Sequence, residues 1–65
     1  MATAPHPIIS ETHAVAYSRE IAGALSEKDL QAAAERHQSH LLPDAARRLT
    51  GEFAARLLLL RRRTP

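Results

Sequence analysis

The sequence predicts an all-α fold, a small domain of three or four helices that follows an extended N-terminal arm. Larger apolar residues recur at intervals of three and four over much of the chain, which is the spacing of amphipathic helices. Capping residues and prolines divide this pattern into segments of ordinary helix length. Both observations hold for residues 10–65, which we expect to form a single domain.

Residues 1–9 are predicted to form the flexible arm, because two prolines there fix φ and push their predecessors toward extended geometry. Ser10 then offers an N-cap oxygen, and Glu11 places negative charge at the positive end of a helix dipole. The first helix is therefore expected over about residues 11–24.

The second helix is expected over about residues 27–41. Ser26 is a typical N-cap, and Asp29 stands where a capping box places its acidic residue. Apolar and alanine side chains follow on one narrow stripe that another helix can approach closely. Pro43 ends this helix and opens the next, because proline is well accommodated in a first helical turn.

The third helix, expected over about residues 44–62, carries the strongest pattern in the chain. Thr50 and Gly51 form a weak point, but the apolar stripe continues across them and favours one long helix. The run of four leucines near its end covers more of the circumference than one small core can bury. We therefore predict that this helix supplies a protein interface formed by Leu49, Phe53, Leu57, Leu58, Leu59 and Leu60.

The predicted core is thin, since thirteen of the apolar residues are alanine and the chain has 65 residues and no cysteine. Small domains compensate for such a core with disulfides, a metal or a partner. Without cysteine, we expect the fold to be completed by homodimerisation or by a larger protein.

Basic charge is concentrated in the second half of the chain. Residues 1–30 carry a net charge of −2 and residues 31–65 a net charge of +4. A charged rim is predicted around the leucines, and it would orient an acidic-rimmed groove on the partner. Its members are Arg47, Arg48, Arg56, Arg61, Arg62 and Arg63.

These features favour a protein–protein interaction module, such as an adaptor, a docking domain, an accessory subunit or a small regulator. The alternative is a dimeric DNA-binding transcriptional regulator that uses the second and third helices, with the same arginines contacting nucleic acid. The absence of a glycine or small residue in the turn between those helices, and the scarcity of aromatic side chains, count against that alternative.

Catalysis is not expected, because the sequence contains no nucleophile–base pattern, no paired carboxylates and no glycine-rich phosphate loop. His37 and His40 stand three residues apart and could face one metal ion, but their spacing alone is a weak signal, and we predict neither a metal nor a cofactor. A membrane span is not expected, because the longest apolar run, residues 57–60, is too short to cross a bilayer. Attachment to a membrane surface through these leucines and the flanking arginines is not favoured, because the segment is short and the chain has no tryptophan. A cytoplasmic location is expected, because the N-terminus lacks the pattern of a secretory signal.

Overall fold

The computed structural model describes the backbone of residues 6–63 and the side chains of residues 11–63. The prediction of an all-α fold is confirmed, because this part of the chain contains three α-helices, one 3-10 turn and no strand. The elements are α1 (His6–Gly23), α2 (Glu27–His37), the 3-10 turn η1 (Gln38–His40) and α3 (Pro43–Arg63).

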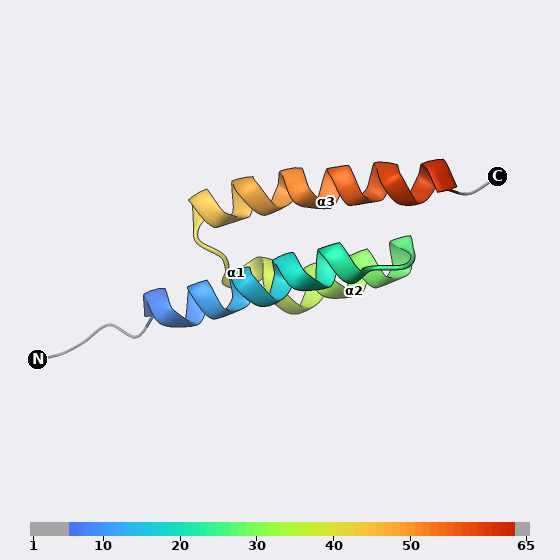
Figure 1. The fold of residues 1–65 in the computed structure, drawn as a ribbon. Helices are drawn as coiled ribbons and strands as arrows, with labels where there is room; N and C mark the ends of the chain where they lie inside the picture. Colours follow the sequence, from blue (N-terminus) through green and yellow to red (C-terminus); the bar gives the residue numbers. More distant parts are fainter. Residues whose placement is uncertain (1–5, 64–65) are drawn as a thin grey trace, which may run out of the picture.

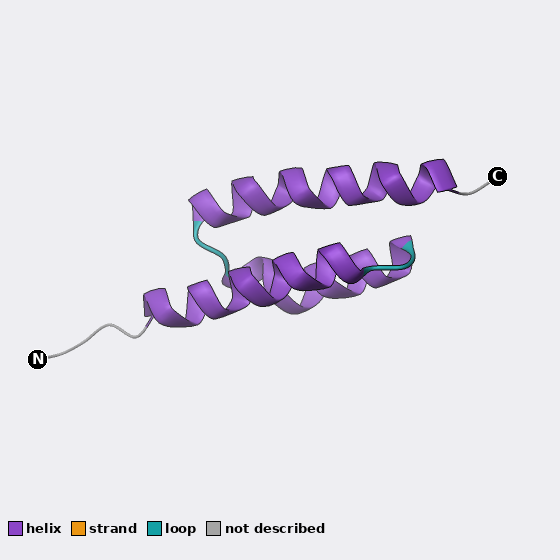
Figure 2. Ribbon diagram, in the orientation of Figure 1, coloured by secondary structure: helices purple, strands orange, loops and turns teal. Residues whose placement is uncertain are grey.

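The three α-helices lie lengthwise beside one another, with α1 and α3 running in one direction and α2 in the opposite direction (Figures 1 and 2). Helix α1 packs closely against both α2 and α3, whereas α2 and α3 touch each other less. Helices α1 and α3 point the same way. Helix α2 lies on one side of this pair, and no other described helix covers the opposite side.

The buried core lies where the three helices meet. Leu30 of α2 and Leu49 of α3 are completely buried, and Tyr17 of α1 lies beside them with its hydroxyl pKa raised by burial. Alanines fill the remaining space, which allows the helix backbones to approach closely. The buried cluster consists of Ala14, Tyr17, Ile21, Ala24, Leu30, Ala33, Leu49 and Leu60.

The connection between α1 and α2 is capped as the sequence predicts. The backbone N–H of Asp29 donates to Ser26 Oγ at 3.2 Å, so Ser26 is the N-cap of α2. The Asp29 carboxylate in turn accepts from the backbone N–H of Leu25 at 3.1 Å, one residue earlier than in a standard capping box.

The boundaries of α1 and α2 differ from the predicted ones. Helix α1 begins at His6, so residues 6–9 are helical and the predicted N-cap at Ser10 is wrong. Pro7 is tolerated there because the first-turn N–H groups of a helix have no intrahelical partner. The rest of the predicted arm, residues 1–5, lies outside the described residues. Helix α2 ends at His37, and η1 replaces the expected last turn.

Helix α3 runs without a break through the weak point at Thr50 and Gly51, as expected. The Thr50 hydroxyl donates to the backbone carbonyl of Ala46 at 2.7 Å, within the helix itself. A threonine bonded in this way leaves the helical ladder intact, so it does not act as a cap.

Candidate interaction surface

The structure divides the six predicted interface residues into three groups. Leu49 and Leu60 are buried in the protein's own core, so in this conformation they are not available to a partner. Phe53 and Leu57 are half-buried and pack against that core. Leu58 and Leu59 remain exposed over 63% and 44% of their surface and are the members of the set that a partner can reach.

The two exposed leucines face different directions. Leu58 lies on the outward side of α3, in line with the exposed residues Arg47, Gly51 and Ala54. Leu59 lies at the edge of a hollow between α1 and α3. This hollow, of about 320 Å³, is lined by Ser18, Ile21, Ala22, Glu52, Ala55, Arg56 and Leu59. We refer to the exposed residues Ala22, Ala55, Leu58 and Leu59 as the leucine patch.

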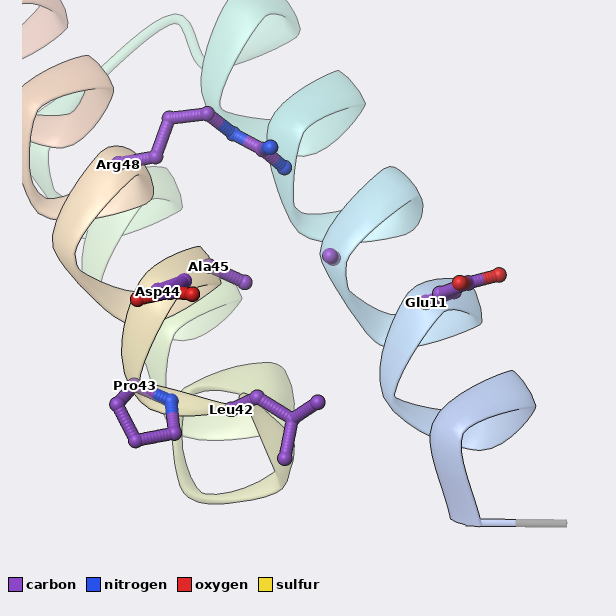
Figure 3. A pocket seen from close by; sticks show the side chains of 7 residues that line it. Glu11, Leu42, Pro43, Asp44, Ala45 and Arg48 are labelled. Carbon is purple, nitrogen blue, oxygen red and sulfur yellow. The ribbon is translucent and has the colours of Figure 1, made fainter.

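The hollow beside Leu59 is one end of a longer depression. A second hollow, of about 400 Å³, shares Ser18, Ala22 and Glu52 with it and continues toward the start of both helices. A third, of about 440 Å³, lies between the start of α3 and α1, where Leu42 points into the space between the helices (Figure 3). Together they form an α1–α3 groove whose end near Leu42 carries the charged side chains Glu11, Asp44 and Arg48 and whose end near Leu59 is mainly apolar.

Helices α1 and α3 are joined across this groove by polar contacts. Ser18 Oγ donates to Glu52 Oε1 at 2.7 Å, and Arg48 Nε lies 4.0 Å from the other carboxylate oxygen of Glu52. Near the opposite end, Arg56 donates from Nε and Nη2 to the backbone carbonyl of Ala24 at 3.1 and 2.7 Å. This contact satisfies a carbonyl just beyond the last turn of α1, which would otherwise lack a helical partner.

The predicted arginine rim is therefore only partly free. Arg56 is used within the fold, and Arg61 donates from Nε to Glu27 Oε2 at 2.9 Å, which ties the end of α3 to the start of α2. This hydrogen bond lowers the pKa of the Glu27 carboxyl and raises that of the Arg61 guanidinium. Arg47, Arg62 and Arg63 are exposed and form no ion pair with any described residue.

A polar cluster that joins α1 to α2 was not anticipated from the sequence. His37 is nearly buried, and its Nε2 donates to Glu20 Oε2 at 2.8 Å, because a carboxylate can only accept. Arg36 also donates to Glu20, through Nε at 3.1 Å and through Nη2. Hydrogen bonds first from His37 and then from Arg36 hold the pKa of the Glu20 carboxyl below its usual range.

The second nitrogen of His37 meets another histidine. Its Nδ1 lies 2.9 Å from Nδ1 of His13, so a hydrogen bond between them requires a proton on one nitrogen and a lone pair on the other. With the His37 proton on Nε2, His13 is the donor. The His13 ring also stacks on His40, with 4.2 Å between ring centroids. Burial, followed by the charges of His40 and His37, lowers the pKa of His13.

The stability of the fold is expected to fall in two steps as the solution is acidified. Unfolded His13 titrates near 6.5 and folded His13 at a lower pH, so the unfolded chain binds more protons between the two values. The free energy of unfolding should therefore decrease as the pH falls from about 6.5 toward the pKa of folded His13. A second loss should follow below about 4.5, as the carboxylates of Glu20 and Glu27 become protonated and their stabilising contacts are lost.

Urea unfolding followed by circular dichroism at a series of pH values measures both steps. A His13→Gln variant should lose the upper step and retain the lower one. An upper step of undiminished size in that variant would show that another group causes it.

Within residues 11–63, no group of three or more histidine, cysteine, aspartate or glutamate side chains is arranged to hold a metal ion. The hydrogen bonds of His37 to His13 and Glu20 instead connect α2 to α1, so the role of His37 in the fold is structural. Nor does any described helix combine the length and hydropathy required to cross a bilayer.

Two features of the exposed surface were also not predicted. Val15 of α1 and Leu42, just before α3, are each 53% exposed, and both line hollows of the α1–α3 groove. The only sign in the sequence that Val15 is exposed is that it lies off the stripe formed by Tyr17 and Ile21.

No protein-family model matches the sequence, and comparison with curated proteins and with solved structures finds no match either.

Proposed function

We propose that the protein is a helical interaction module that binds a helix of a larger protein through the leucine patch. The observation that carries this proposal is the exposure of two adjacent leucines: Leu59 borders the apolar end of the α1–α3 groove, and Leu58 lies next to it on the outward side of α3. Exposed apolar side chains that gather at the edge of an apolar hollow are typical of surfaces that bind another protein. Helix-in-groove recognition buries apolar side chains of this kind.

The charges around the leucine patch favour an acidic partner. Arg62 and Arg63 lie three and four residues beyond Leu59, and both are themselves exposed. Arginine presents a planar set of donors that matches a carboxylate, so acidic residues flanking the apolar positions of the partner helix would pair with them. Such rim contacts raise the association rate and fix the orientation more than they raise affinity.

The alternative, a DNA-binding regulator, is less well supported by this geometry. Helix α3 lies lengthwise beside α1 and α2, so its inner face is occupied by the core (Figure 1). Two of the six arginines proposed for phosphate contacts, Arg56 and Arg61, are bound to groups of the protein itself. A recognition helix needs its arginines free to reach the groove and the phosphates.

Substitution of both exposed leucines should abolish partner binding. Wild-type protein and the double variant Leu58→Glu/Leu59→Glu are immobilised and compared for proteins retained from an extract of the source cells, quantified by mass spectrometry. We expect at least one protein to fall roughly tenfold or more on the double variant, as for the loss of central apolar contacts of an interface. Circular dichroism establishes that both proteins are equally helical.

Leu25→Glu is the matched control, because Leu25 is 78% exposed and does not line the groove. It should retain the same proteins as wild type. An identical set of retained proteins on all three would contradict the proposal. If the protein instead binds a random DNA duplex, and Arg47→Ala/Arg48→Ala but not the leucine variant abolishes this salt-sensitive binding, the DNA-binding alternative replaces it.

A further inference from the structure

An exposed side of α1, along the edge of the α1–α3 groove, carries a short pattern that the fold does not use. Glu11, Val15 and Arg19 are all exposed and follow one another at intervals of four residues, so they lie on one stripe of the helix. Neither Glu11 nor Arg19 forms an ion pair with any described residue. A hollow of about 410 Å³ lies along this stripe, lined by Glu11, Thr12, Val15, Ala16 and Arg19.

This stripe is complementary to itself in one orientation. When two copies of a helix pack antiparallel about a central residue, positions equally far before and after it face each other. Glu11 and Arg19 are each four residues from Val15, which places them about 6 Å from it along the helix axis. An antiparallel pair centred on Val15 therefore brings Glu11 of each copy to Arg19 of the other, with the valines in contact at the centre.

The same charges oppose the other orientation. In a parallel pair, Glu11 would face Glu11 and Arg19 would face Arg19, and like charges at an interface are repulsive. The neighbouring side chains also allow close approach, because Ala16 beside Val15 is small. On the α3 side, Arg48 and Glu52 line a hollow together with Arg19, and because Arg48 lies 4.0 Å from Glu52, Arg19 is the cation left to pair with an incoming Glu11 carboxylate.

From this pattern we infer that the protein forms a two-fold symmetric homodimer through antiparallel contact of the Glu11, Val15 and Arg19 stripe of α1. The inference does not depend on the leucine patch, since the stripe includes neither Leu58 nor Leu59. The interface stabilises a chain whose own core is small, as expected for domains of this length.

Charge reversal tests the dimer directly, with solution mass measured by sedimentation equilibrium over a range of protein concentrations. Wild type should show a concentration-dependent dimer that weakens as salt is raised. Glu11→Arg alone, or Arg19→Glu alone, places like charges opposite each other twice and should raise the dimer Kd by roughly tenfold or more.

The two-fold symmetry also predicts two combinations of variants in which dimerisation is restored. The double variant Glu11→Arg/Arg19→Glu should dimerise like wild type, and an equimolar mixture of the two single variants should form a heterodimer. Glu35→Arg, an exposed α2 carboxylate without an ion pair among the described residues, is the control and should leave the Kd unchanged. A wild-type protein that stays monomeric at every concentration overturns the inference, as does a dimer that neither single variant weakens.

Discussion

Leu49→Ala is expected to lower the free energy of unfolding by about 2–5 kcal/mol. Leu49 is completely buried where α3 meets the other two helices, so truncation removes its apolar contacts and leaves a cavity that the surrounding side chains can fill only partly. A domain of this length has a total stability of about 3–10 kcal/mol. The variant should therefore lose a large part of its stability, measured as a lower urea midpoint in circular dichroism.

Leu58→Ala is the control on the same helix. Leu58 is 63% exposed and belongs to no core contact, so its truncation should change stability by less than about 0.5 kcal/mol. The two variants thus separate the leucines of α3 that hold the fold from the leucines proposed to bind a partner. Similar losses in both would mean that Leu58 is covered in solution, for example by a partner copy.

The number and order of the helices followed from the sequence because their signals are local. Ser26 caps α2, Pro43 opens α3, and the apolar stripe of α3 holds it together across Gly51. The predicted start of α1 lies several residues too late. A proline breaks a helix only beyond its first turn, and no local feature of the sequence shows that Pro7 belongs to the first turn of α1.

The surface could be predicted only in part, because burial depends on the neighbour that each side chain meets. The spacing of Leu49 and Leu60 marks them as apolar-stripe residues, yet it does not say whether the protein's own helices or a partner cover them. The same limit applies to Arg56 and Arg61, whose acceptors are 32 and 34 residues away in the sequence. The histidine cluster also depends on a contact across helices, since His13 and His37 are 24 residues apart.

That cluster is the second feature whose removal should have a large effect. His37→Phe keeps a ring of similar size in the same place but removes both of its hydrogen bonds, to Glu20 and to His13. The loss of a buried polar partner typically costs about 1–3 kcal/mol. We expect a decrease of that size in the free energy of unfolding at neutral pH, measured by urea titration.

His40→Phe is the matched control, because His40 is exposed and contacts His13 through ring stacking, which phenylalanine preserves. It should remain close to wild type in stability. If His37→Phe is also as stable as wild type, the His37 ring serves only to fill space between α1 and α2. If only His37→Phe is destabilised, the hydrogen bonds of His37 are what hold α2 to α1, and the leucine core alone is not sufficient to fix these two helices.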